Sequence, residues 1–356
     1  MTRTPSRIIR LAALVAVVAG IVPAAAQDDY PILVYPCPKL QPAPKIDGDL
    51  GDACWKQAPL ASGFTWYNRE ELVDVQTALR VGYDEQCLYV AIRCDEPKMR
   101  LVKSVATPRD SKEVFRQEAI EMFVDPHHSH THYYQLAFCS AGTFYDSVLQ
   151  NTAWDSKTIA AAKELANEWT LEIAIPWADL KVKPAPGHVV GFNVCRDRHV
   201  SNARQWTNWA QTKANFHDPI RFAHLVLSGD AKSIGQMEAE FRKGERNGVI
   251  RVLGHEGYSN MAYAALAATA VADVDKLMAD LAAVGQKEAS AQCRREIDKR
   301  LAELKQRLEP CRQKLAAGAK LDALEWHRMG RELHRLKLDL GNLIWEARLK
   351  ALLDSI

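Results

Sequence analysis

The sequence predicts a mainly β protein, a sandwich of two antiparallel sheets with a jelly-roll-like character, followed by a C-terminal α-helical bundle of coiled-coil-like character. Two observations predict this division. Fifteen of the 16 prolines precede residue 220, and only Pro310 follows it. Short runs of alternating apolar and polar residues fill the first part, whereas the strong helix formers Ala, Leu, Lys, Arg and Glu dominate from Met261 onward.

Eight or more strands are expected in the first part. In one run Ile120, Met122 and Val124 share a face, and Glu121 and Phe123 occupy the other. The remaining runs are residues 77–83, 88–94, 133–139, 143–148, 169–175, 190–194 and 221–227. Many short strands without intervening helices are typical of two packed sheets.

Apolar residues in the last part recur at spacings of three and four, which predicts three consecutive helices packed along apolar seams. The seams contain Ala270, Val274, Leu277, Leu281 and Val284, then Ile297, Leu301, Leu304, Leu308, Cys311 and Leu315, then Leu333, Leu336, Leu340, Leu343 and Ala347. We expect turns around Gly285 and Gly318 and a bundle independent of the sandwich. The predicted domains are residues 27–230 and 261–356, joined by a linker of open fold over residues 231–260.

The N-terminus has the pattern of a signal peptide. Arg3, Arg7 and Arg10 precede an apolar run over residues 11–22 and a small-residue site at residues 24–26. The run is shorter than the ~20 residues of a membrane span. Cleavage after residue 26 would give a secreted or periplasmic protein, and we expect no transmembrane segment.

The charge balance limits the kinds of partner that we expect, and the cysteine content indicates whether disulfides could form. The 46 Lys and Arg residues nearly balance 44 Asp and Glu residues, so we expect no nucleic-acid partner. An exported protein can form disulfides among its eight cysteines. A Cys37–Cys54 bond is one open pairing, and no Cys-x-x-Cys motif indicates a zinc ribbon.

No catalytic signature is present. Glu118 and Glu121 are three apart on a predicted strand and therefore face opposite ways, which is a poor arrangement for a pair of glycosidase acids. The acidic segment that begins at Asp47 lacks calcium ligands at Gly51 and Ala58, and is more typical of a turn with an Asp cap. We therefore expect a protein that is not an enzyme.

Four histidines fall within residues 127–132. On an extended hairpin arm, His128, His130 and His132 would project to one side at steps of about 6.6 Å. Neutral imidazoles in this arrangement bind Zn, Cu or Ni, so these three residues are candidate metal ligands. The alternative is a polar hairpin loop that contains histidines by chance.

An ordered series of motifs resembles carbohydrate-binding module family 9 over residues 43–228. The series begins with Lys45-Ile46-Asp47-Gly48-Asp49-Leu50 and Trp55, continues through Tyr83-Asp84-Glu85, Glu118-Ala119-Ile120-Glu121-Met122-Phe123 and Glu172-Ile173-Ala174-Ile175-Pro176-Trp177, and ends at Trp209 and Phe216-His217-Asp218-Pro219. Each motif alone is weak, but their order and spacing are fairly specific. The helical region lies outside the resemblance.

The resemblance implies a β-sandwich that holds the end of a sugar chain between two aromatic rings, often with structural calcium. It implies that Phe115 and Trp209 are the aromatic platforms, that Glu121 binds hydroxyl groups and that Gln135 is a polar strand residue of the site. Ala137 stands where an arginine is expected. Arg196 is a further candidate at the rim of the site, as are Trp66, Trp206 and Arg198.

We therefore expect an exported carbohydrate-binding protein that is accessory to glycan breakdown, acts alongside glycoside hydrolases, and has a possible protein partner at its C-terminal helices. Two alternatives stay open. One is a haem-binding redox module of related fold, for which Met99, Met122 and the histidines are available. The other is a non-catalytic envelope scaffold in which the sandwich binds no ligand.

Overall fold

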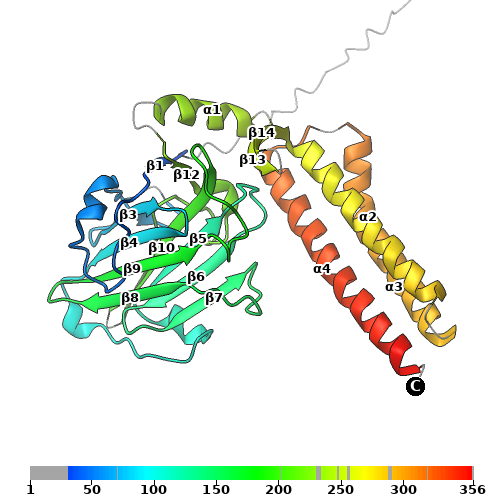
Figure 1. The fold of residues 1–356 in the computed structure, drawn as a ribbon, viewed down its shortest axis with the longest axis horizontal. Helices are drawn as coiled ribbons and strands as arrows, with labels where there is room; N and C mark the ends of the chain where they lie inside the picture. The colour runs from blue at the N-terminus through cyan, green and yellow to red at the C-terminus, as the bar shows by residue number, and fades with distance from the viewer. Residues whose placement is uncertain are drawn as a thin grey trace, which may run out of the picture.

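The computed structural model describes residues 31–69, 71–200, 202–229, 234–246, 248–254, 257–287, 291–318 and 320–354. The predicted signal peptide, residues 1–26, lies outside the described residues. Figure 1 shows a sheet-rich body on one side and a group of long helices that extends away from it.

Two sheets form the body. The strands are β1 (Val34–Cys37), β2 (Thr65–Trp66), β3 (Thr77–Tyr83), β4 (Cys87–Asp95), β5 (Ala119–Asp125), β6 (Tyr134–Cys139), β7 (Phe144–Val148), β8 (Ile159–Glu164), β9 (Glu168–Pro176), β10 (Val189–Val200), β11 (Ala203–Asn208) and β12 (Ala223–Leu227). The large sheet has the order β1-β12-β10-β5-β6-β7, with β11 paired to β10 and β2 paired to β11. The small sheet has the order β3-β4-β9-β8. All pairs are antiparallel except β1–β12, so the predicted two-sheet sandwich is confirmed.

Alternation along the strands explains why the two sheets pack. Ile120, Met122 and Val124 on β5 point into the same core as Leu171 and Ile173 on β9. The residues between them on β5 point to the outer face, where Phe123 joins a second apolar cluster with Phe216 and Phe222. The large sheet is therefore covered on both faces at this point.

Strand β10 is the central strand of the large sheet. Its first residues pair with β12, residues 191–197 pair with β5, and residues 195–200 pair with β11. At Gly191 an added Cβ would lie 3.1 Å from the Cβ of Asp125, so the close approach of β10 to β5 favours glycine. Because three strands depend on it, β10 fixes which side chains meet on each face.

The described residues of the segment 231–260, whose fold the sequence left open, belong mainly to a helix and to two paired strands. Helix α1 (Ile234–Arg246) places Phe241 against Ile32, Val189 and Val226, at the β1–β12 end of the large sheet. Strands β13 (Val249–Gly254) and β14 (Gly257–Ala262) pair with each other in a separate two-stranded sheet. The predicted domain boundaries themselves stay a prediction.

Three long helices follow the hairpin, as predicted. They are α2 (Tyr263–Lys287), α3 (Ala291–Ala316) and α4 (Ala323–Asp354). The predicted seams form one apolar cluster, in which Val274, Leu308 and Leu336 are fully buried. Gly318 has a φ of +66°, a left-handed conformation that suits the turn between α3 and α4.

The helical bundle is not independent of the sandwich. The histidine loop (residues 127–132), which joins β5 to β6, contacts α2 and α4. Trp326 Nε1 donates to the carbonyl oxygen of Ser129 over 2.9 Å, and His327 Nδ1 pairs with the carbonyl oxygen of His130 over 3.0 Å. The Tyr263 hydroxyl hydrogen-bonds His130 Nδ1 over 3.2 Å. We call this set of contacts the joint.

The eight cysteines all lie in described parts of the chain, and none of them forms a disulfide. Seven of them are buried. Cys37 belongs to the core between the sheets, whereas Cys54 belongs to a cluster on the outer side of the small sheet. The structure therefore does not contain the Cys37–Cys54 bond that the sequence left open.

Gly330 on α4 tests how tightly the joint is packed. An added Cβ there would lie 2.4 Å from Thr131 Cγ2, whereas one at Gly341 on the same helix would meet nothing within 4 Å. We expect Gly330→Ala to lower the free energy of unfolding by roughly 1–3 kcal/mol, as overpacking does. Gly341→Ala, the matched control, should leave it unchanged or raise it by up to about 1 kcal/mol through helix propensity. Urea unfolding measures both variants. Equal effects at the two sites would contradict tight packing of α4 against the histidine loop at the joint.

Candidate functional site

A pocket of about 330 Å³ opens on the outer face of the large sheet. Its lining combines aromatic and acidic side chains: Tyr67, Phe115, Glu121, Asp197, Trp206, Ala214, Asn215, Phe216 and His217. These residues come from β5, β10 and β11, from the short 3₁₀ helix η3 (Lys112–Arg116), which contains Phe115, and from nearby loops. The pocket is thus built on three paired strands, which hold its floor rigidly.

The strand register places the acids and the indole together. Glu121 on β5 lies opposite Cys195 on β10, and Asp197 on β10 lies opposite Trp206 on β11. Residues directly opposite in a sheet point to the same face, as do residues two apart on one strand. Glu121, Asp197 and Trp206 therefore share the outer face. Trp206 is 40% exposed, so its ring is open to a ligand.

Glu121 and Asp197 form a buried carboxyl pair at the floor of the pocket. Burial raises the pKa of Glu121, and hydrogen bonds from Asp197 and Gln135 oppose that rise. The pKa of Asp197 lies well above its usual range because of burial and the charge of Glu121. Gln135 Nε2 donates to Glu121 Oε2 over 2.6 Å. The pair consequently retains a proton at pH values where exposed carboxyl groups have lost theirs.

The structure brings three of the five predicted sugar-binding residues together. Phe115 and Glu121 line the pocket, and Gln135 supports Glu121 from the neighbouring strand β6. Phe115 also packs against Tyr145 with ring centroids 4.9 Å apart. Asp197 was not singled out from the sequence, although its alternation with two arginines indicates that it faces away from them.

Trp209 does not line the pocket, in contrast to its predicted role as a platform. It is only 8% exposed and belongs to the core between the sheets. Its ring makes edge contacts with Tyr35 and Phe192. The physical reason is strand alternation: Trp209 comes three residues after the outward-facing Trp206 and therefore points to the inner face, beside the core residue Val194, whose carbonyl oxygen accepts from the Trp209 backbone nitrogen. Trp206, three residues earlier, provides the exposed ring instead.

Arg196 does not lie at the rim either, because it faces the interior of the sandwich. Its Nε donates to Glu118 Oε1 over 2.8 Å and its Nη1 donates to the carbonyl oxygen of Asp95 over 2.9 Å. Arg198, on the same face, binds Glu96 through two nitrogens at 2.6 and 2.9 Å. The two arginines thus belong to a buried ion-pair network that joins the two sheets.

The histidine loop does not place the three predicted metal ligands on one side. His128 and His130 have φ values of 49° and 60°, so the loop is not extended there. His128 Nε2 lies 2.6 Å from His224 Nδ1 and 3.4 Å from His130 Nε2, whereas the His132 ring packs against Tyr134 and His334. The third imidazole of this group is therefore that of His224, from β12, and not that of His132.

These imidazoles are adapted to burial. Burial and neighbouring imidazoles lower the pKa of His130 and of His224, and burial lowers the pKa of His132 to about 4. Groups with a lowered folded-state pKa stabilise the fold above pH ~6.5, and that stability is lost as pH falls. The loop therefore acts in the joint through neutral rings.

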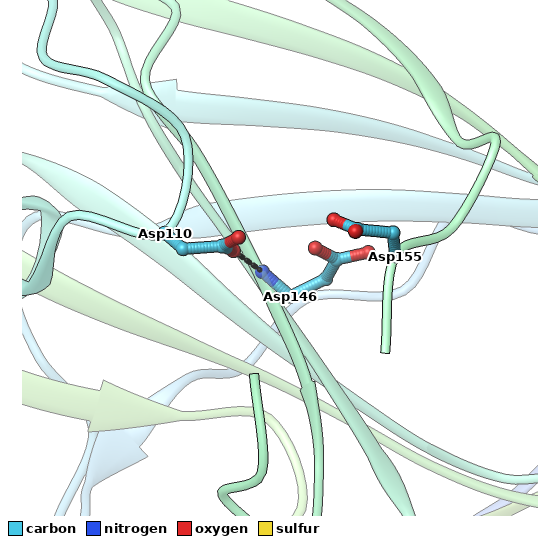
Figure 2. Close-up of side chains that lie close together, drawn as sticks. All are labelled: Asp110, Asp146 and Asp155. Carbon is cyan, nitrogen blue, oxygen red and sulfur yellow. Dashed lines mark hydrogen bonds between the residues drawn. The ribbon is translucent and has the colours of Figure 1, made fainter. Parts of the chain in front are cut away.

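One acidic cluster among the described residues has the spacing of a cation site. Oxygens of Asp110, Asp146 and Asp155 all lie within 4.8 Å of one another, and Figure 2 shows the carboxylates of Asp146 and Asp155 facing each other. Arg109 binds Asp146 through Nη2 at 2.8 Å and Asp155 through Nε at 3.3 Å. Three carboxylates and one guanidinium leave two formal negative charges, which match a calcium ion with its preference for oxygen ligands.

The segment that begins at Asp47 is a turn, as its sequence indicates. Asp47 Oδ1 accepts from the backbone nitrogen of Asp49, and Asp49 Oδ1 accepts from that of Gly51. The carboxylate of Asp49 also pairs with Lys163 over 3.0 Å. These bonds use the carboxyl oxygens for local capping.

Residues 46–230 match the family model described as carbohydrate family 9 binding domain-like. Two curated relatives are Endo-1,4-beta-xylanase A of Thermotoga neapolitana, 26% identical over 200 residues, and Exoglucanase XynX of Acetivibrio thermocellus, 23% identical over 203 residues. The alignments cover 52% and 56% of this chain but only 17% and 18% of those proteins. The chain thus spans about a sixth of their length.

Solved structures resemble the sandwich. A family 9 carbohydrate-binding module from Caldicellulosiruptor kristjanssonii in complex with cellotriose is 17% identical, with a TM-score of 0.44, and covers 56% of this chain and 96% of its own. A putative carbohydrate-binding protein from Bacteroides uniformis is 13% identical, with a TM-score of 0.46. The match covers 55% of this chain and 99% of that protein's chain. In the described parts of the chain, no helix combines the length and apolar character needed to cross a bilayer.

Arg196 should be essential to stability rather than to ligand contact. Arg196→Met leaves Glu118 buried without its guanidinium, which should lower the free energy of unfolding by about 3–5 kcal/mol. Arg93→Met is the control, because Arg93 makes ion pairs with Asp95 and Glu168 at the surface and such pairs contribute about 0–1 kcal/mol. Denaturant unfolding measures both variants. A loss below about 1 kcal/mol for Arg196→Met would contradict the assignment.

Proposed function

Because the chain belongs to the carbohydrate family 9 binding domain-like family, we propose that its pocket binds the end of an oligo- or polysaccharide. One observation carries the proposal: an exposed indole, Trp206, lies in the same pocket as the buried carboxyl groups of Glu121 and Asp197. A pyranose has an apolar C–H face and a polar rim. Aromatic rings and charged hydrogen-bonding groups suit these two parts.

In this proposal the sugar ring stacks on Trp206, and Phe115 provides the second aromatic surface. The carboxyl pair binds adjacent hydroxyl groups. A protonated carboxyl donates one hydrogen bond and an ionised carboxylate only accepts, so a pair that retains one proton can do both. Gln135 holds Glu121 in position through its 2.6 Å hydrogen bond.

The wider role is also a proposal. We infer an exported protein without catalytic activity of its own that is accessory to glycan breakdown. Support comes from the basic and apolar N-terminal sequence and from the names of the curated relatives, which are a xylanase and an exoglucanase. A protein partner at the C-terminal helices belongs to the same proposal, since Trp345 on α4 is 63% exposed.

The haem alternative is less well supported. Met99 and Met122 both belong to the buried core between the sheets. A thioether in this position is packed among apolar side chains and is not directed toward the imidazoles of the histidine loop. The residues thus favour a sugar-binding pocket over a Met–His haem site.

Trp206→Ala should weaken binding of cellotriose or another bound oligosaccharide by about 2- to 13-fold, because aromatic stacking contributes roughly 0.5–1.5 kcal/mol. Trp345→Ala is the matched control, since it removes an exposed indole from α4, outside the pocket. Isothermal titration calorimetry measures both affinities. If the Trp345 variant lost binding and the Trp206 variant retained it, the pocket would be the wrong site.

We also propose that calcium binds at Asp110, Asp146 and Asp155. Calcium that binds only the folded state at 100 times its dissociation constant adds about 2.7 kcal/mol, roughly 5–10 °C in the melting temperature for a domain of this size. Excess chelator should therefore lower the melting temperature, and added Ca²⁺ should restore it.

Two variants identify the calcium site in that experiment. Asp155→Asn removes an exposed ligand and should abolish the response to chelator. Asp49→Asn, in the turn near the N-terminal end of the sandwich, should retain it. A melting temperature of the wild-type protein that is identical with chelator and with Ca²⁺ would overturn the calcium proposal.

A further inference from the structure

The pocket contains two acids but no basic side chain among the described residues that line it. Four of the lining side chains are aromatic: Tyr67, Phe115, Trp206 and Phe216. His217 is also part of the lining, but burial and the charge of Arg331 lower its pKa to about 4, so its ring is neutral at neutral pH. The pocket thus combines aromatic side chains with two acidic ones, Glu121 and Asp197.

The strand alternation keeps the two neighbouring arginines of β10 away from this charge. Arg196 and Arg198 flank Asp197 on β10, but their guanidinium groups bind Glu118 and Glu96 on the opposite face of the sheet. Within the pocket, Asp197 is 1% exposed and its carboxyl group meets the carboxyl group of Glu121. Buried acids in proteins are almost always paired with a positive charge or with strong donors.

A positively charged ligand would supply the missing partner. An ammonium group has three N–H donors, enough to bind both carboxylates, and its charge removes the repulsion between them. Aromatic faces within about 6 Å also attract a cation, through the negative charge of the ring face. Both features of the pocket therefore favour the same kind of ligand.

We propose that the pocket binds a sugar with a free, protonated amino group, with the ammonium at Glu121 and Asp197 and the sugar ring on Trp206. This inference rests on the proposed function and names the class of sugar. A neutral hydroxyl group in the same place leaves one acid without a counter-charge. An N-acetyl group has no charge and adds bulk beside the carboxyl pair, so the pocket discriminates against acetylated amino sugars.

Three trisaccharides that differ only at carbon 2 test the proposal: the β-1,4-linked glucosamine trimer, its fully N-acetylated form and cellotriose. They carry an amino, an acetamido and a hydroxyl group on the same backbone. Calorimetry at pH 6, where the amines are charged, should show at least tenfold tighter binding of the glucosamine trimer than of the other two. Binding should also release protons from the carboxyl pair, which appears as a dependence of the enthalpy on the buffer.

Asp197→Asn locates the effect. The variant keeps the size and hydrogen-bonding capacity of the side chain but removes one acid, so the tenfold preference should fall to near one while cellotriose binding persists. Glu113→Gln is the matched control, because Glu113 is an exposed acid two residues from Phe115 and is absent from the pocket lining. It should keep the full preference.

The outcomes separate this inference from the function on which it rests. Cellotriose binding that equals or exceeds binding of the glucosamine trimer overturns the amino-sugar inference and leaves the sugar-binding proposal intact. A preference that survives Asp197→Asn but is lost in Glu113→Gln overturns it as well, because attraction to surface charge then explains the result. Absence of binding to all three trimers and to a wider set of polysaccharides counts against both proposals.

Discussion

The buried ion pair between Arg196 and Glu118 is the constraint on which the site depends. A guanidinium inside a sandwich is stable only if its donors are satisfied, and here Glu118 and the carbonyl oxygen of Asp95 satisfy them. With Arg196 directed inward, the pleat of β10 directs Asp197 outward. The position of the acid in the pocket thus follows from the pairing of the arginine in the core. The same network connects β10 of the large sheet to β4 of the small one, so it also holds the two layers in register.

The carboxyl pair costs stability at neutral pH. Because the pKa values of Glu121 and Asp197 are raised in the folded state, folding takes up protons at this site. The stabilising contribution of such groups is present at low pH and is lost as pH rises through the raised pKa values. A protein under selection for stability alone would replace one of the acids by an amide. A buried pair of acids with no basic partner in the pocket is therefore the signature expected of a ligand site.

Regular patterns in the sequence determined how much could be predicted. Alternation along β5 and β9 and the heptad-like seams of α2 to α4 are repeated signals, so the sandwich and the helices were predicted correctly. Single residues were harder. Trp206 and Trp209 are three residues apart and therefore point to opposite faces of the sheet, but no strand was predicted over residues 203–208, so their faces could not be assigned from the sequence. His128 and His130 adopt positive φ values that no residue type reveals, so the direction of their rings could not be predicted from an assumed extended arm.

The histidine loop links the helical bundle to the edge of the pocket through a continuous set of contacts. On one side, Trp326 and His327 of α4 bind its backbone. On the other side, Tyr133 follows the loop directly, and its hydroxyl hydrogen-bonds His217 of the pocket lining over 3.0 Å. Arg331 of α4 also acts on His217 through its charge. Because the same few residues anchor α4 and position one wall of the pocket, the bundle is best understood as a part of the structure that supports the pocket, and not as a separate stalk.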